Sequence, residues 1–119
     1  KVIALNEDTS YTYTRIGDIH RRRKQVGLAI KAYDKAISYD SVYPLAYLYR
    51  GKMKMTEEYQ NLEESKKDLY KYVELEPEDP EVYNTLGAIA AYLKVADYCE
   101  FWQKSCDRGD CELLNTYCK

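Results

Sequence analysis

The hydrophobic positions of this chain recur with the period of an α-helix. Two stripes follow the i, i+3, i+4, i+7 spacing of one helical face. The first comprises Ile16, Ile19, Ala29, Ile30, Tyr33, Ala36 and Ile37, and the second Val82, Leu86, Ile89, Ala90 and Leu93. Strand-like alternation is confined to residues 11–14, which fit the start of a helix better. We therefore predict three helix pairs and a closing helix, near residues 10–23, 27–40, 44–57, 60–76, 80–94, 96–108 and 110–118.

The sequence also repeats with a period much longer than that of a helix. Gly17, Gly51 and Gly87 are separated by 34 and 36 residues, and a tyrosine precedes each glycine by four positions. Residues 2–7, 36–41 and 72–77 superpose without gaps at the same two intervals. Two independent registers thus report one repeat. We place the two extra residues of the second repeat in a turn around residues 57–62.

Prolines and glycines mark the predicted joints. Pro44, Pro77 and Pro80 lie between units, where a helix can begin but not continue. Asp79 is expected to cap the helix that starts at Pro80, and Gly109 to end the helix before it.

These residues resemble the tetratricopeptide repeat, whose 34-residue pattern combines an aromatic, a large apolar and a small residue with alanine-like positions around a second aromatic, and then proline. The matching residues are Tyr13, Ile16, Gly17, Ala29, Tyr33 and Ala36; then Tyr47, Gly51, Ser65, Leu69, Tyr72 and Pro77; then Tyr83, Leu86, Gly87, Cys99 and Cys106. The resemblance implies an all-α fold, a right-handed superhelical solenoid of about three helix pairs plus a C-terminal capping helix.

The resemblance also implies an organisation within a single domain, residues 1–119. Residues 1–9 would end a preceding repeat, residues 10–43, 44–79 and 80–109 would form three repeats, and residues 110–119 the capping helix. Each repeated glycine is expected to face a small residue, so that the paired helices approach closely. Arg50 departs from the pattern, because it stands where a large apolar residue is usual. Ser41 replaces the turn proline.

In a solenoid of this kind the first helix of each pair lines the concave side, where a ligand binds. The positions that would face inward are Tyr11, Thr14, Asp18, Arg21, Leu45, Leu48, Tyr49, Lys52, Met55, Glu81, Asn84, Thr85, Ala88 and Tyr92. Tyrosine and methionine suit an extended or helical peptide with apolar anchors. The alternative is that many of these tyrosines only fill gaps between helices.

Two groups of charged and polar residues bear on the kind of ligand. Some members of the family clamp a terminal carboxylate with Lys, Asn and Arg, but the matching places here hold Thr14, Asp18, Tyr49, Glu81 and Thr85, so we do not expect that clamp. The basic run at residues 20–24 could contact phosphate or an acidic peptide. It also has the character of a solvated helix end, where cations are favourable.

Four cysteines lie near the C-terminus: Cys99, Cys106, Cys111 and Cys118. Cys99 and Cys106 are seven residues apart, as are Cys111 and Cys118. Two residues at this spacing lie about 10.5 Å apart along a helix and cannot form a disulfide with each other. Cross-pairing of Cys106 with Cys111 and of Cys99 with Cys118 is feasible, but four cysteines allow three connectivities. Alternatively, Cys99 and Cys106 are small buried residues at alanine-like places. A zinc site would favour closer pairs, so no metal is expected. Disulfides would indicate an exported or periplasmic protein, and free thiols a cytoplasmic one.

Composition narrows the functional classes. The formal net charge of the 119 residues is -2, which gives no overall attraction to nucleic acid or anionic membranes. No apolar run is long enough for membrane insertion. The chain has one histidine and no phosphate-binding loop, metalloprotease or nucleophile-elbow motif, so neither catalysis nor a cofactor is expected. We predict a non-catalytic scaffold that binds a peptide or protein segment in its concave groove. The alternatives are a self-associating structural module and a thiol-redox or metal-handling protein.

Overall fold

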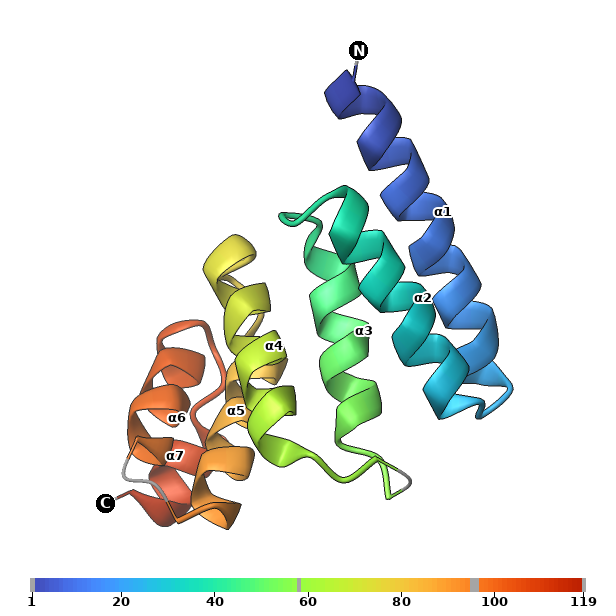
Figure 1. Ribbon diagram of the computed structural model, residues 1–119. Helices are drawn as coiled ribbons and strands as arrows, with labels where there is room; N and C mark the ends of the chain where they lie inside the picture. The colour runs from blue at the N-terminus through green and yellow to red at the C-terminus, as the bar shows by residue number, and fades with distance from the viewer. Residues whose placement is uncertain (1, 58, 95–96, 119) are drawn as a thin grey trace. The chain divides into compact units, whose positions relative to one another are not determined.

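The computed structural model describes residues 2–57, 59–94 and 97–118, with side-chain surroundings from residue 8 onward (Figure 1). The regular secondary structure of this part of the chain is all helical: turns connect the helices, and no strand is present. Its helices are α1 (Val2–Arg22), α2 (Val26–Tyr39), α3 (Pro44–Lys54), α4 (Leu62–Leu75), α5 (Pro80–Tyr92), α6 (Tyr98–Asp107) and α7 (Glu112–Tyr117). The predicted all-α class is confirmed.

The helices group into two compact units. The N-terminal unit, Lys1–Leu75, contains α1 to α4, and the C-terminal unit, Glu76–Lys119, contains α5 to α7. Within the first, α1 packs on α2, α2 on α3, and α3 on α4; within the second, α5 packs on α6 and α6 on α7. The three expected helix pairs are therefore present. The repeat boundaries themselves stay a prediction.

From α2 onward the helices begin and end within three residues of the predicted positions. Pro44 and Pro80 each open a helix, and the Asp79 carboxylate accepts a hydrogen bond from the Glu81 backbone N–H at 3.1 Å. The longest turn, residues 55–61, is the one expected to hold the extra residues.

The start of α1 was predicted wrongly. We expected a helix from about residue 10, yet α1 runs without a break from Val2. No proline or glycine occurs before Gly17 to stop a helix. The repeat pattern placed the end of a preceding unit at residues 1–9, but α1 continues through this predicted joint.

Each helix pair is closed by a large side chain that lies against a glycine. The Tyr33 ring is fully buried against Gly17, where an added Cβ would meet ring carbon Cε1 at 2.5 Å. Leu69 covers Gly51, with 3.0 Å to the corresponding position, and the indole of Trp102 covers Gly87. The expectation that a small residue faces each glycine was wrong at Gly17 and Gly87, whereas at Gly51 the small Ser65 donates a hydrogen bond to the glycine carbonyl at 2.7 Å. A missing Cβ leaves a hollow, and close packing fills it with a large group.

The helix α1 packs through small polar residues. Ser10 and Thr14 are buried at 0% and 2% exposure, whereas Ile16 and Ile19 are 38% and 49% exposed. The Ser10 hydroxyl donates to the Ala36 carbonyl at 2.8 Å, and the Thr14 hydroxyl to the Ser10 carbonyl at 2.9 Å. Because both hydroxyls are satisfied, small side chains allow a close approach to α2 without a buried polar penalty. Ile16 and Ile19, the first members of the hydrophobic stripe, are therefore not buried with the rest of it.

Arg50, the departure from the repeat pattern, lies in an ion-pair network. Its guanidinium donates to both carboxylate oxygens of Asp68, from Nε at 2.9 Å and from Nη2 at 2.7 Å, and from Nη1 to Asp34 at 2.7 Å. Lys54 Nζ lies 3.3 Å from Asp68 and 3.2 Å from Glu64. Burial opposes the charge of Arg50, but the hydrogen bonds and charge of Asp68 and Asp34 outweigh it and raise its pKa. At this one position, charge pairing between α3 and α4 takes the place of the large apolar residue of the repeat pattern.

Adding a methyl group at Gly17 tests the glycine contact. We expect Gly17→Ala to destabilise the N-terminal unit by about 1–3 kcal/mol, because Tyr33 is enclosed and cannot move away. At Gly27 nothing lies within 4 Å of an added Cβ, so the control Gly27→Ala is expected to be neutral or to stabilise by about 0.5 kcal/mol. Urea unfolding followed by circular dichroism measures both. Equal effects of the two substitutions would refute the contact as a constraint.

Removing the shared carboxylate tests the ion-pair network. Asp68→Asn keeps the shape but leaves Arg50 and Lys54 without their buried counter-ion, so a loss of about 3–5 kcal/mol is expected. The matched control Asp34→Asn removes a carboxylate that is 54% exposed and is expected to cost at most about 1 kcal/mol. The measurement is again urea unfolding. A cost at Asp68 no larger than that at Asp34 would show that the network is dispensable.

Candidate functional site

In the N-terminal unit, four of the predicted groove residues meet between α1 and α3. The Arg21 guanidinium lies 4.5 Å from the ring centre of Tyr49, and Lys52 Nζ lies 5.8 Å from the same ring. Asp18 accepts a hydrogen bond from Arg21 at 3.5 Å. We call Asp18, Arg21, Tyr49 and Lys52 the Arg21–Tyr49 cluster. Two cations and one carboxylate beside an aromatic ring make a surface suited to polar contacts with a peptide.

Tyr33 connects this cluster to the core. Its ring is enclosed against Gly17, while its hydroxyl donates to the Asp18 carboxylate at 2.7 Å. Burial and then the hydrogen bond to Asp18 raise the pKa of Tyr33 above its usual value of 10.0, although Arg21 acts in the opposite direction. Asp18 is thus held between a core residue and a surface cation.

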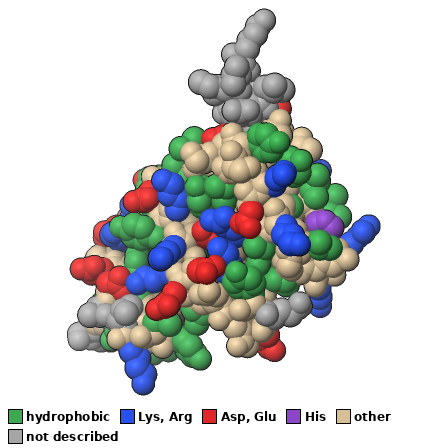
Figure 2. All heavy atoms as spheres, in the orientation of Figure 1, with side chains coloured by type: hydrophobic (Ala, Val, Ile, Leu, Met, Phe, Trp, Pro, Cys, Tyr) green, Lys and Arg blue, Asp and Glu red, His purple; other side chains and the backbone are tan. Residues whose placement is uncertain are grey.

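The other predicted groove residues of this unit divide into two sets. Tyr11, Leu45 and Met55 are 49%, 40% and 37% exposed. Thr14 and Leu48 are instead buried at 2% and 7%, so neither is accessible to a ligand. The resemblance to the repeat family placed these two on the inward side, but the packing of α1 and α3 encloses them. Figure 2 shows acidic and basic side chains interspersed on the face in view, with hydrophobic side chains exposed between them.

The C-terminal unit contains a hollow of about 890 Å³ between α5, α6 and α7. We call it the Trp102 pocket. Its lining residues are Ala88, Ala91, Tyr92, Lys94, Tyr98, Trp102, Leu113 and Tyr117. Of these, only Ala88 and Tyr92 were predicted as site residues, because the prediction considered the first helix of each pair alone. The aromatic residues of α6 and α7 were the available signal.

Aromatic side chains determine the shape of this pocket. The ring centre of Trp102 lies 5.3 Å from that of Tyr98 and 5.6 Å from that of Tyr117. The indole N–H of Trp102 donates to the Asn84 carbonyl at 3.2 Å. Trp102 is buried, whereas Tyr92 and Tyr117 are 74% and 64% exposed and stand at the edge. The pocket therefore has a fixed aromatic floor and exposed aromatic walls.

Asn84 and Thr85, both predicted to face the groove, have local structural partners instead. The Asn84 side-chain amide donates to Asp110 at 2.8 Å, which ties α5 to the segment before α7. The Thr85 hydroxyl donates to the Glu81 carbonyl at 3.1 Å within α5. Neither residue lines the Trp102 pocket.

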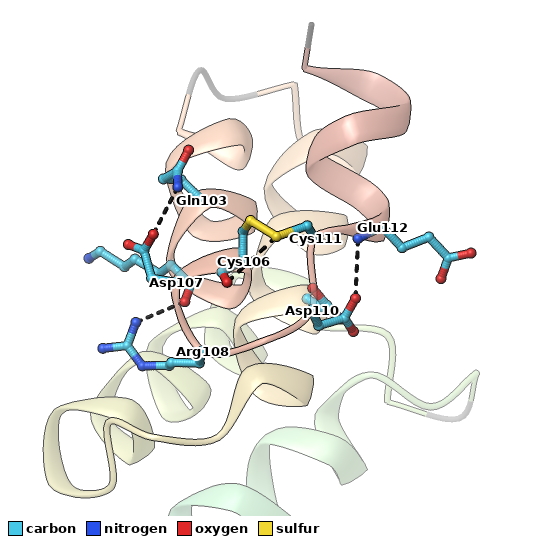
Figure 3. The surroundings of a disulfide bond; sticks show 9 residues. Gln103, Cys106, Asp107, Arg108, Asp110, Cys111 and Glu112 are labelled. Atoms are coloured by element: carbon cyan, nitrogen blue, oxygen red, sulfur yellow. Dashed lines mark hydrogen bonds between the residues drawn. A yellow bond between two sulfur atoms is a disulfide. The ribbon is translucent and has the colours of Figure 1, made fainter.

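Two disulfides hold α7 in place. Cys106–Cys111 closes the turn between α6 and α7 (Figure 3), and Cys99–Cys118 joins the start of α6 to the residue after α7. These are the pairings judged feasible from the sequence. The alternative interpretation, that Cys99 and Cys106 are free residues in alanine-like places, is wrong. The fully buried small residue of α6 is Ser105, and Cys106 is only half-buried. The reason is that Trp102 lies one residue nearer to Gly87 than Tyr33 lies to Gly17, which shifts the buried positions of α6 by one residue.

The surroundings in Figure 3 show how this corner is built. The Glu112 backbone N–H donates to Asp110 at 3.3 Å where α7 begins, and the Gln103 amide donates to Asp107 at 2.9 Å along α6. Gly109 has a positive φ of 111°, which allows the sharp turn. α7 itself has only six residues and none is fully buried. Its position thus depends on its covalent links more than on its core contacts.

The described residues show no metal site and no membrane-spanning helix. Among them, no three histidine, cysteine or acidic side chains converge as a metal site would require. Nor does any helix there have the length and apolar character needed to cross a membrane. Residues 20–22 of the basic run form the last turn of α1, the position that favours cations.

The chain is similar in structure to several tetratricopeptide-repeat (TPR) domains. It aligns with MamA at 24% identity and a TM-score of 0.78 over 86% of this chain, and spans 55% of the MamA chain. The first TPR of Spaghetti (RPAP3), bound to the HSP90 peptide SRMEEVD, gives 16% identity and a TM-score of 0.78, covering 92% of this chain and 88% of that one. The Sgt2 TPR domain from Aspergillus fumigatus gives 20% identity and 0.69, covering 90% and 75%.

No protein-family model matches the sequence, and the comparison with curated proteins finds no match. The structural similarities nevertheless agree with the helix pairs described above. The predicted solenoid of tetratricopeptide type is therefore confirmed as the fold of this chain.

The raised pKa of Tyr33 predicts a loss of stability at alkaline pH. Folding favours the protonated phenol, so this stabilisation is complete below pH 10 and is lost as pH rises from the unfolded pKa toward the higher folded value. At pH 11 the expected loss is on the order of 1 kcal/mol. Urea unfolding at intervals from pH 8 to pH 11 should show a smaller decline for Tyr33→Phe than for the wild type. Parallel curves would show that Tyr33 titrates normally.

Proposed function

We propose that this chain is a non-catalytic interaction scaffold that binds a peptide or protein segment along the first helices of its pairs. The observation that carries the proposal is the exposure of large side chains at the predicted inward positions, Tyr11, Leu45, Met55 and Tyr92. Large amphipathic or apolar groups that remain in water are typical of binding surfaces. Two of the structurally similar domains are bound to an HSP90 peptide, which supports the same class of ligand here.

The chemistry of the partner follows from the charges beside these groups. In the N-terminal unit, Arg21 and Lys52 flank Tyr49. In the C-terminal unit, the one charged residue that lines the Trp102 pocket is Lys94. The proposed ligand therefore carries large apolar side chains with acidic residues next to them. A terminal carboxylate is not the expected feature, because Thr14 and Asp18 occupy two of the places where a clamp would need donors.

The two disulfides favour an exported location, since such bonds persist in oxidising compartments. They also bear on the alternative of a metal-handling protein. While all four cysteines are paired, no thiolate is available to bind a metal ion. The scaffold function does not depend on the location.

A peptide-display selection against the oxidised protein tests the proposed function. Peptides selected on the wild type should bind Tyr92→Ser at least about tenfold more weakly, because a large exposed aromatic group is removed from the surface. Lys52→Glu should disfavour peptides rich in acidic residues. Both residues are exposed, so neither substitution is expected to affect folding.

The matched control is Tyr70→Ser. Tyr70 is 44% exposed on α4, the second helix of its pair. Unchanged binding by this control and weaker binding by Tyr92→Ser are the expected results, measured by fluorescence anisotropy. Selected peptides that bind Tyr92→Ser and Lys52→Glu as tightly as the wild type would refute the first-helix surface. A stable dimer in light scattering that excludes peptides would instead favour self-association.

A further inference from the structure

The Trp102 pocket is a broad, open hollow of about 890 Å³, lined mainly by alanine and aromatic residues. Ala88 and Ala91 leave the α5 side shallow, and Tyr98 and Trp102 present ring faces and edges. A flat aromatic group can lie against these rings through offset or edge-to-face contacts.

The positive charge of Lys94 determines which residue should lie next to the aromatic side chain of the ligand. Lys94 is the single charged residue among the lining residues, and no ion pair involving Lys94 is found in the described part of the chain. A carboxylate next to the aromatic side chain would complement this ammonium group. The complementary occupant is thus an aromatic residue of a partner peptide followed or preceded by Asp or Glu.

One wall of the pocket belongs to α7. Leu113 and Tyr117 are on this six-residue helix, which is too short to be stable alone and contains no fully buried residue. Cys118 directly follows Tyr117, so the Cys99–Cys118 bond holds the pocket end of α7. Cys106–Cys111 holds only its start. Both Cys99 and Cys118 are partly exposed.

We propose that the Trp102 pocket binds an aromatic side chain flanked by a carboxylate, and that the Cys99–Cys118 disulfide switches the site on. The proposal rests on the scaffold function proposed above and names its anchor and its control. A dithiol attacks the bond through a mixed disulfide and becomes a disulfide itself, transferring two electrons and two protons to give the Cys99 and Cys118 thiols. Tyr117 and Leu113 then leave the pocket, and the aromatic anchor loses one wall.

The test uses the whole chain and the indole N–H of Trp102, the only tryptophan, as an NMR probe. The ligands are the blocked dipeptides Phe-Glu, Phe-Lys and Ala-Glu. In the oxidised protein, Phe-Glu should shift the indole resonance and bind at least about threefold more tightly than Phe-Lys, and Ala-Glu should not shift it. Lys94→Glu should reverse the preference between the two Phe dipeptides.

The switch is tested by removing one bond at a time. Cys99→Ser/Cys118→Ser, like dithiothreitol treatment, should abolish the Phe-Glu shift and raise amide hydrogen exchange at residues 112–118 while α5 stays protected. The matched control Cys106→Ser/Cys111→Ser keeps the Cys99–Cys118 bond and should keep the shift. Hydrogen exchange needs no ligand, so it reports on α7 independently of binding.

Three results would overturn the proposal. One is the absence of a Phe-Glu shift in the oxidised protein; display-selected peptides that still bind would then leave the scaffold function intact. The second is a shift that persists when Cys99–Cys118 is absent. The third is exchange that rises in α5 as much as in residues 112–118, because the bond would then support the whole unit and not a separable wall.

Discussion

The contact of a large side chain with a glycine of the neighbouring helix determines the arrangement of every helix pair. Tyr33 on Gly17, Leu69 on Gly51 and Trp102 on Gly87 occupy hollows that any Cβ would close. The same contacts also position residues of the two candidate binding surfaces. The Tyr33 ring is buried, yet its hydroxyl orients Asp18 beside Arg21. Trp102 seals the α5–α6 contact and is also part of the pocket. Packing and candidate function therefore share residues.

The two units reinforce this shared contact by different means. In the N-terminal unit, Arg50 and Asp68 join α3 to α4 through a half-buried bidentate ion pair. The C-terminal unit has only three helices, and a small assembly buries too little apolar surface to fasten a six-residue helix. The two disulfides fasten α7, because its core contacts are too few to do so. The disulfides thus explain why a pocket wall can be built from so short a helix.

The helix pairs were predictable because their causes are local in sequence. Prolines at residues 44 and 80, the Asp79 cap and the spacing of the glycines act through neighbouring residues, and six helices were located from them. The start of α1 was not predicted, because the repeat pattern placed a joint near residue 9 and α1 runs through it. Ile16 and Ile19 belong to the hydrophobic stripe, yet they are exposed. Ser10 and Thr14 are buried against α2 instead, because small groups permit the close approach of α1 and α2.

The sequence by itself determined the repeat, the all-α class, most helix bounds and the shortlist of feasible cysteine pairings, since spacing along a helix is set by its geometry. Tertiary structure alone decided which candidate residues face solvent. It buried Thr14 and Leu48, gave Asn84 a structural partner in Asp110, and brought Asp18, Arg21, Tyr49 and Lys52 together. It also created the Trp102 pocket from α5, α6 and α7. These outcomes depend on the distance between helices, and that distance is set by which side chain fills each glycine hollow.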